Sequence, residues 1–256
     1  MLLAIFYAVI FIGDAQIDVL SAYPDSIASM IADRIGSERV LDCGDLVEHG
    51  LMLEEVEYQR YGQIFPNSVP VPGNHDHYDG LNYWTWDTTV DLYVDGLHIV
   101  GFDSNEWADP TARTRLGRSL QDETFTILYL HHQIYSDNLR NGAIADLIRP
   151  ALLPVIEAAN VDLVISSHGH AYERHDDGKR TFLVIGGAGA PLDAVGSSPT
   201  QVVAVSAHHW LEVQPAGDGV TCLVHGLNGL LDSFTVEGPT VKSETRVWGS
   251  IKAMYR

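Results

Sequence analysis

Positive charge is scarce in this sequence. Its 256 residues contain 15 Lys and Arg against 34 Asp and Glu, so the formal net charge is −19 at pH 7. Because an acidic surface repels phosphate backbones, we expect nucleic acid to be an unlikely partner. No run of basic residues indicates a membrane-surface patch either.

Cysteine is scarce as well. Cys43 and Cys222 are the only two, and they lie far apart in the sequence. This number and spacing exclude a disulfide framework and a metal site built from thiolates. We therefore expect both side chains to be small buried apolar groups.

The sequence also lacks a hydrophobic run long enough to cross a membrane. The apolar opening, MLLAIFYAVIFIG, is too short to span a bilayer, and no basic residue precedes Arg34 to resemble the start of a signal peptide. We expect the second half of this run to form a buried strand. On this basis we predict a cytoplasmic or otherwise soluble intracellular protein without a membrane partner.

Short apolar runs alternate with helix-like segments along the rest of the chain, which is typical of an α/β fold. Hydrophobic residues make up 46% of the sequence, enough for one large core. We predict a single domain over residues 1–239, followed by a polar C-terminal tail over residues 240–256. The expected helices cover about residues 24–36, 51–63 and 139–160, the last one interrupted by Pro150 and Pro154.

The expected strands are short, and turn signals such as Asp95-Gly96 separate several of them. The first ends near residue 12, and the others cover residues 39–43, 68–71, 90–94, 97–102, 124–130, 161–165, 181–185, 201–205, 209–213, 220–225 and 230–236.

Five of these apolar runs end in a carboxylate, an amide or an imidazole. The groups are Asp14 with Gln16, Asp45, Asn74-His75-Asp76, His131-His132, and His168-Gly169-His170. Each group alone has an ordinary explanation, since Gly-Asp is typical of turns and histidines at a strand end are often solvated. The carboxyl ends of strands line the ligand crevice of α/β sheets, so the whole set predicts one site with metal ligands.

The motifs GDAQ, GDLV, GNHD, LHHQIY and SHGHAYER follow one another in the order found in calcineurin-like metallophosphoesterases. The resemblance extends from residue 8 to about residue 237. It implies a two-sheet β-sandwich flanked by helices, in four αββα layers, with a dinuclear metal centre at the strand ends. It also implies an enzyme that hydrolyses phosphoric esters.

The resemblance implies two sets of metal ligands that share one bridging carboxylate. The first set is Asp14, Gln16, Asp45 and His170, and the second is Asp45, Asn74, His131 and His168. Oxygen and imidazole ligands without thiolate suit two divalent or trivalent ions such as Mn, Fe or Zn.

The implied reaction is in-line attack of metal-bound hydroxide on a small phosphomonoester or phosphodiester. His75, oriented by Asp76, would contact the phosphoryl group or protonate the leaving oxygen. We expect His132, Asn105 and Tyr135 to contact the substrate. One of three arginines, Arg113, Arg115 or Arg140, could hold a second phosphate or an anionic leaving group.

The chain departs from its relatives at three places. Gln16 stands where many members of the family have His, Glu48 stands where purple acid phosphatases have Tyr, and residues 136–138 replace the extra histidine pair of that group. An iron–tyrosinate centre is therefore not expected. Two alternatives stay open: a nuclease or nucleotide phosphodiesterase of the same family, and a catalytically silent scaffold that binds metal.

Overall fold

The computed structural model of the chain describes residues 8–36, 38–49, 54–76, 89–239 and 241. The first three residues of the helix expected over 51–63 lie outside this part. So does the expected C-terminal tail, apart from Val241, which is buried and whose backbone N–H donates to the Gly217 carbonyl at 2.8 Å. The chain is therefore attached to the core at least as far as Val241.

Thirteen strands form two sheets in the described part. The six-stranded sheet has the order β13-β12-β11-β1-β2-β3, and the seven-stranded sheet has the order β10-β8-β9-β7-β6-β5-β4. The strands of the first sheet are β1 (Val9–Ile12), β2 (Val40–Asp42), β3 (Ser68–Pro70), β11 (His209–Pro215), β12 (Gly219–Gly226) and β13 (Gly229–Glu237). Those of the second sheet are β4 (Thr89–Val94), β5 (Leu97–Phe102), β6 (Phe125–Leu130), β7 (Leu163–Ser166), β8 (Tyr172–Asp176), β9 (Thr181–Ile185) and β10 (Gln201–Val205).

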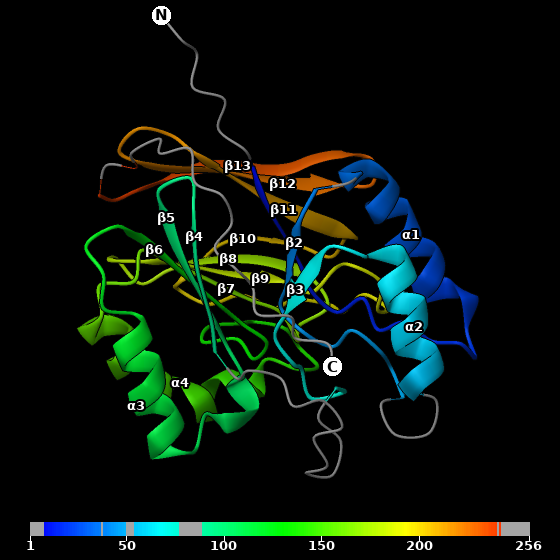
Figure 1. Cartoon of the computed structure of the whole chain (residues 1–256), viewed down its shortest axis with the longest axis horizontal. Helices are drawn as coiled ribbons and strands as arrows, with labels where there is room; N and C mark the ends of the chain where they lie inside the picture. The colour runs from blue at the N-terminus through cyan, green and yellow to red at the C-terminus, as the bar shows by residue number, and fades with distance from the viewer. Residues whose placement is uncertain (1–7, 37, 50–53, 77–88, 240, 242–256) are drawn as a thin grey trace, which may run out of the picture.

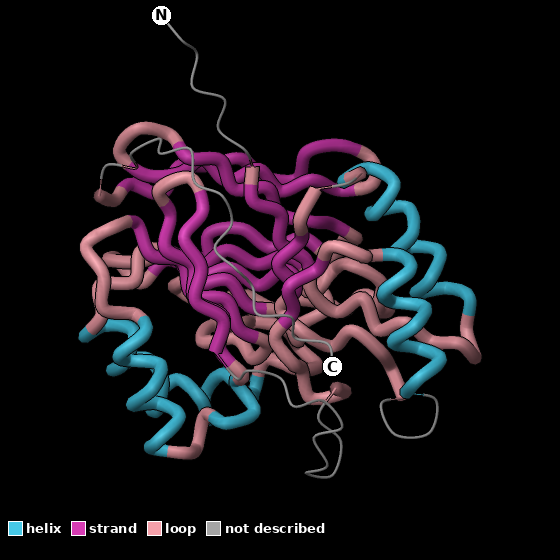
Figure 2. The backbone as a smooth tube through the Cα atoms, in the orientation of Figure 1, coloured by secondary structure: helices cyan, strands magenta, loops and turns pink. Residues whose placement is uncertain are grey.

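Helices cover the outer faces of both sheets (Figure 1). The helices α1 (Ala22–Ile35) and α2 (Glu54–Ile64) lie beside the first sheet, and α3 (Pro110–Ser119) and α4 (Ala143–Ala158) lie beside the second. Figure 2 shows the strands gathered between these two pairs of helices. The predicted α/β sandwich flanked by helices is thus confirmed.

Three apolar layers hold this arrangement together. The middle layer lies between the sheets, where Phe11 of β1 meets Tyr129 of β6 edge to face, with ring centroids 6.0 Å apart. The outer layers join each sheet to its helices. All four residues of β1 are buried because both faces of the sheet are covered, which explains its continuous apolar sequence. Both cysteines are buried and unpaired, as predicted.

The strands that matter for the site run parallel to their neighbours. In the first sheet β1, β2 and β3 pair in parallel, and in the second β5, β6 and β7 do so. Their carboxyl ends therefore reach the same edge of each sheet. Among the described residues, no helix is both long and apolar enough to cross a membrane.

Two helices differ from the sequence prediction. Pro150 and Pro154 do not interrupt α4, which is continuous from Ala143 to Ala158. Both prolines lie on its exposed face, where carbonyl groups that lose an N–H partner can bond to water, while the opposite face is buried against the sheet. The helix α3 was not predicted, although Asp109 caps it by accepting from the Thr111 N–H at 2.8 Å and Pro110 begins it.

Candidate metal centre

The residues predicted to bind metal follow strand after strand at one end of the sandwich. Asp14 lies two residues after β1, Asp45 three residues after β2, and His131 directly after β6. Backbone hydrogen bonds join the first two loops, from Asp14 N to the Gly44 oxygen at 3.0 Å and from Gln16 N to the Asp45 oxygen at 2.9 Å. The parallel strands thus bring residues that are distant in sequence to the same place.

The backbone is strained where these side chains enter the site. Six described residues other than glycine have positive φ angles, and four of them are Asp14 (57°), Gln16 (42°), Asp45 (55°) and His168 (64°). Such conformations are uncommon for residues with a Cβ atom and persist where the surrounding structure enforces them. Their concentration at four predicted ligands is a typical mark of a functional site.

The second predicted ligand set is compact. The Nε2 atom of His131 lies 3.0 Å from Oδ1 of Asn74, 3.1 Å from Nδ1 of His168 and 3.4 Å from Oδ2 of Asp45. His131 is fully buried, and its Nδ1 atom lies 3.0 Å from the Cys43 carbonyl oxygen. Because a carbonyl oxygen can only accept a hydrogen bond, Nδ1 carries the proton of this ring.

The same contacts imply a cation at this position. Burial, together with the neighbouring His132 and His168, lowers the pKa of His131 well below its ordinary value, so the ring is neutral. Its Nε2 atom is then an acceptor, and it faces Oδ1 of Asn74 and Oδ2 of Asp45, which are acceptors as well. A metal ion satisfies such converging lone pairs, and the donor set is the one such an ion prefers.

The first predicted ligand set is more open. The Nε2 atom of His170 lies 3.5 Å from Oδ1 of Asp14, and this buried oxygen makes no hydrogen bond. The Nδ1 atom of His170 lies 2.9 Å from the Pro191 carbonyl, so Nε2 is the atom left to bind a ligand. The Gln16 amide nitrogen donates to Oδ2 of Asp45 at 3.3 Å, and a half-turn of this amide would present its oxygen instead.

Asp45 connects the two sets. Its Oδ2 atom is the one near both Gln16 and His131, and atoms of Asp14, Asp45 and His131 that can bind metal lie within 4.8 Å of one another. Burial, and then the negative charges of Asp14 and Asp76, raise the pKa of Asp45 well above its ordinary value. A cation between these carboxylates would remove this repulsion.

Two glycines allow the loops to approach the carboxylates. A Cβ atom on Gly73 would lie 2.1 Å from Oδ1 of Asp45, and one on Gly186 would lie 2.5 Å from Oδ2 of Asp14. Side chains at either position would displace a predicted ligand. The lack of a side chain is therefore part of how these loops form the site.

His75 lies beside the predicted bridge, but Asp76 does not orient it. The His75 backbone N–H donates to Oδ1 of Asp45 at 2.8 Å, and its ring Nδ1 lies 2.9 Å from the Glu48 carbonyl. The Asp76 carboxylate instead accepts hydrogen bonds from three other groups. These are the Leu46 N–H at 3.1 Å, the Gly73 N–H at 2.8 Å and the Tyr58 hydroxyl at 2.9 Å. The predicted contact between Asp76 and His75 is wrong, because these loop N–H groups occupy the carboxylate.

A cavity of about 490 Å³ opens beside these residues. Six of the predicted site residues line it, together with several that the sequence reasoning did not select. The six are Gln16, Asp45, Asn74, His75, His168 and His170, and the others include Asp18, Tyr23, Glu48 and Asn141. No motif marks the added residues, because they come from loops and a helix start that only the fold brings together.

The three predicted substrate contacts do not line the cavity, although the His132 ring lies beside the second ligand set, with its centroid 4.9 Å from that of His131. Asn105, in the 3-10 turn η2 (Ser104–Glu106), uses its amide nitrogen to donate to the Gly73 carbonyl at 3.1 Å. His132 is buried, with Nδ1 2.9 Å from the Ser104 hydroxyl. The Tyr135 ring packs on Phe182, with centroids 4.7 Å apart.

Arg140 is the one candidate arginine that lines the cavity. Arg113 donates to the Trp107 carbonyl at 2.8 Å, and Arg115 pairs with Glu106 at 2.8 Å. The Arg140 side chain is 70% exposed and lies 3.8 Å from Asp193, so it is free to reach an anion. Arg113 and Arg115 lie on α3, so whether they reach the cavity depends on the position of this helix, which the sequence did not reveal.

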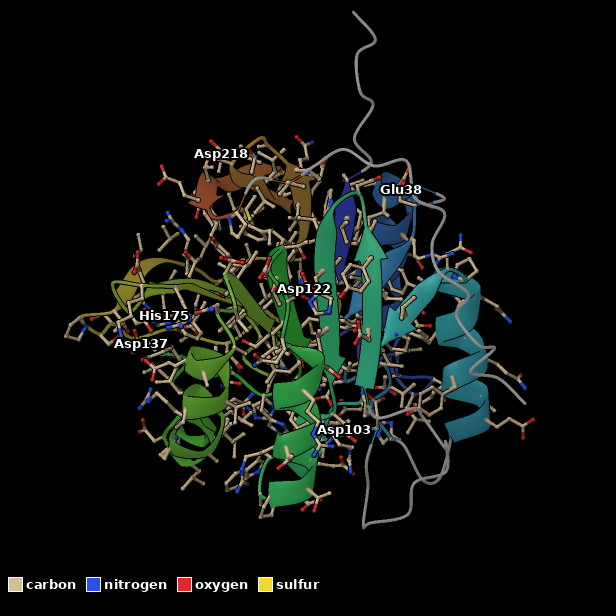
Figure 3. The ribbon with its side chains drawn as sticks, turned by 60° about the vertical axis from the view of Figure 1, so that its left-hand side comes forward. Glu38, Asp103, Asp122, Asp137, His175 and Asp218 are labelled. Carbon is tan, nitrogen blue, oxygen red and sulfur yellow. The ribbon has the colours of Figure 1, made fainter. Side chains whose placement is uncertain are left out.

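Two other groups of acidic and histidine side chains lie outside the predicted ligands. In one, Glu57 accepts from the N–H groups of Val19 and His49. In the other, Glu173 accepts from the Asp137 N–H at 2.6 Å and lies 3.1 Å from Nε2 of His175. Figure 3 shows Asp137 and His175, which belong to the second of these groups, well apart from Asp103. Asp103 lies in the loop that follows β5. Both glutamates already hold backbone groups in place, which explains their burial.

Comparison with known proteins identifies a family and a fold for the chain. A model of the calcineurin-like phosphoesterase family matches residues 8–172. The fold is similar to that of purple acid phosphatase PPD1 from yellow lupin (Lupinus luteus), with a TM-score of 0.76 and 14% identity over 93% of this chain and 55% of that chain. No curated protein sequence matches the chain.

Two further solved structures share most of their length with this chain. GAP50, described as the anchor in the inner membrane complex of Plasmodium, has a TM-score of 0.73 and 14% identity over 93% of this chain and 90% of that chain. A dimetal phosphatase from Danio rerio has a TM-score of 0.63 and 10% identity over 90% and 98% of the two chains.

Proposed function

Because the chain belongs to the calcineurin-like phosphoesterase family, we propose that it hydrolyses a small phosphomonoester or phosphodiester at a pair of metal ions. The observation that carries the proposal is the convergence of lone pairs on Nε2 of His131, beside the Asp14 oxygen that makes no hydrogen bond. Buried acceptors without a shared proton are costly unless a cation lies among them.

The proposed ligands of the first ion are Asp14, Gln16, Asp45 and His170, and those of the second are Asp45, Asn74, His131 and His168. When bound, two ions such as Mn, Fe or Zn would supply a nucleophilic water and polarise the phosphoryl oxygens. The protein holds the imidazoles ready for them, since carbonyl groups of Cys43 and Pro191 fix the Nδ1 atoms of His131 and His170.

His75 is the proposed catalytic residue. The Glu48 carbonyl holds its Nδ1 atom at 2.9 Å, and its Nε2 atom lies 3.9 Å from Oδ2 of Asp45, at the wall of the cavity. From there the ring, when it carries a proton on both nitrogens, could donate from Nε2 a hydrogen bond to the phosphoryl group or a proton to the leaving oxygen. Asp76 would act indirectly, by fixing the loop that carries His75 and the backbone at Leu46.

The cavity supports a small substrate in preference to nucleic acid. Its volume of about 490 Å³ lies in the range of small-molecule sites. Arg140 is the only Lys or Arg among the described residues that line it, and Asp18 and Glu48 add negative charge at its wall. A nuclease would need cations along a strand of phosphates, which this wall does not offer.

A scaffold without activity is the second candidate. It is favoured by the similarity to GAP50, which is described as an anchor and which this chain matches over nearly its whole length. The filled set of ligand positions and the placement of His75 favour the enzyme. The two functions differ in one measurable property, which is turnover by the metal-loaded protein.

The test uses the full chain loaded with Mn, Fe or Zn and then dialysed. Mass spectrometry counts the ions per chain, and hydrolysis of p-nitrophenyl phosphate and bis-p-nitrophenyl phosphate is followed by absorbance. Two ions with turnover of either ester would support the proposal. Two tightly held ions without hydrolysis of any ester would instead favour the scaffold, and a chain that holds no ion would contradict both.

A further inference from the structure

One wall of the cavity is built from residues that have no part in the proposed metal centre. Tyr23 and Pro24, in the first turn of α1, line the cavity together with Pro191. Tyr23 is 48% exposed and lines a pocket that also contains His75 and His170. This wall offers a flat apolar surface close to the reacting groups.

The Tyr23 ring is fixed in place. Its hydroxyl lies 2.7 Å from Nε2 of His208, whose Nδ1 atom lies 3.0 Å from the Gly187 carbonyl. Since that carbonyl can only accept, Nδ1 donates to it and Nε2 accepts from the Tyr23 hydroxyl. His208 is 9% exposed, so a buried chain of hydrogen bonds positions a half-exposed ring. A ring held this way loses little freedom when a ligand covers it.

The charge around this wall restricts the ligand. Asp18 and Glu48 line the same cavity, and Arg140 is the only basic side chain of the Lys or Arg type among the described lining residues. A leaving group with additional phosphates would meet these carboxylates and be repelled. The wall therefore suits a planar group that brings no further negative charge.

We infer that Tyr23 is a stacking surface for the leaving group, and that the substrates are phosphate esters of planar aromatic alcohols or of compounds carrying a planar ring. The inference rests on the proposed phosphoesterase function and specifies its substrate class. Tyr23 would contribute binding to the ring of the ester, while the reacting phosphorus lies at the metal centre. Stacking on an aromatic side chain is tolerant of ring identity, so several aromatic groups should be accepted.

The experiment compares two esters in the metal-loaded protein: 2-naphthyl phosphate, which has a planar leaving group, and glycerol 2-phosphate, which has none. The readout is the ratio of the two kcat/KM values. Comparing that ratio between variants removes the intrinsic reactivity of each ester. In Tyr23→Leu the ratio should fall about tenfold, the size of a lost stacking contact. Tyr23→Phe keeps the ring and loses the hydrogen bond to His208, so its ratio should lie between those of Tyr23→Leu and the wild type.

Tyr93 supplies a matched control. It is 42% exposed and anchored through its hydroxyl, 2.6 Å from Asp122, but it lies on β4 and does not line the cavity. Tyr93→Leu should keep the wild-type ratio. If Tyr23→Leu also kept it, while both esters were hydrolysed, the inference would be wrong and the proposed function would stand. If the metal-loaded wild type hydrolysed neither ester, the proposed function would fail and this inference with it.

Discussion

The two proposed metal positions share Asp45 but are prepared for their ions in different ways. At the second position His131 holds Asn74 and His168 at 3.0 and 3.1 Å, and burial keeps the ring neutral. At the first position His170 lies 3.5 Å from Asp14, and Gln16 directs its amide nitrogen rather than its oxygen at Asp45. The second position is thus assembled before an ion arrives, and the first must adjust.

Electrostatics also indicates that the second position is better prepared to bind its ion than the first. Burial lowers the pKa of His168 as well as that of His131, so both imidazoles of the second position are neutral and each has one ring nitrogen without a proton. At His170 burial also acts to lower the pKa, but the carboxylates of Asp14 and Asp193 outweigh it, and the net pKa is raised. An ion at the first position therefore competes with a proton, and we expect it to be held less tightly.

The largest effect should come from Asp45→Asn, which changes the ligand that both positions share. We expect metal affinity to fall by more than about a hundredfold at each position, since changes to residues around metal ligands already cost 10–100-fold. Turnover should be lost with it. Ions per chain, counted by mass spectrometry after dialysis, measure the effect. Asp146→Asn, at a side chain that is 75% exposed, is the control. Loss at only one position would show that Asp45 is not a bridge.

The next largest effect should come from His75→Ala. Because the His75 ring is fixed to the Glu48 carbonyl and not to an ion ligand, both metals should stay bound. Turnover should fall by about 10²–10⁴-fold, the usual contribution of proton transfer by a positioned side chain. The measurement pairs kcat with metal content, and His225→Ala, on β12, controls for loss of an imidazole elsewhere. An emptied site would mean that His75 is a ligand and not the acid.

Gln16→His should reduce the difference in metal affinity between the two positions. An imidazole binds these metals better than an amide, so the first position should bind its ion roughly tenfold more tightly, about 1.4 kcal/mol. The second position should not change. Histidine is among the residues that tolerate the positive φ of 42° found here. Stepwise metal titration by calorimetry measures both events, with Gln214→His on β11 as control. Equal tightening at both positions would contradict the assignment.

The site could be predicted from the sequence because strand ends connect sequence order to position in space. Asp14, Asp45 and His131 each follow a buried strand. Parallel pairing brings the ends of β1 and β2 together, and the packing of the two sheets places the end of β6 beside them. Side-chain direction in the loops could not be predicted, because it depends on partners distant in sequence. Asp76 turns to the Leu46 and Gly73 N–H groups for this reason.

The fold likewise divides into elements that the sequence predicts and elements that depend on partners distant in sequence. Long apolar strands such as β6 were predicted, whereas the polar strand β8, with the sequence YERHD, was not, since only its pairing with β9 and β10 makes it a strand. In α3 just Ala112 and Leu116 are buried, too few to produce a helical pattern. Tyr135 is the last residue of the LHHQIY motif but turns toward Phe182 in the outer apolar layer, which no local signal indicates.

His209 resembles the proposed histidine ligands but has no carboxylate beside its ring. Replacing it should give the smallest of the predicted effects. Like His131 and His170, it has Nδ1 beside a carbonyl, that of Ala207 at 2.7 Å, and its buried Nε2 has no hydrogen-bond partner. Its ring meets the edge of Tyr172 instead of a carboxylate. It therefore resembles the proposed ligands in its anchor and differs from them in what Nε2 faces.

Burial lowers the pKa of His209 to about 4, below the value of about 6.5 in an unfolded chain. Between these values the unfolded state binds more protons, so this residue lowers stability as the pH falls. The loss should reach about 1 kcal/mol at pH 6 relative to pH 8. His209→Leu should lessen this pH dependence, measured by thermal unfolding, without changing the metal content. A pH dependence equal to that of the wild type would show that His209 does not stay neutral in the folded protein, and loss of metal would place it in the site.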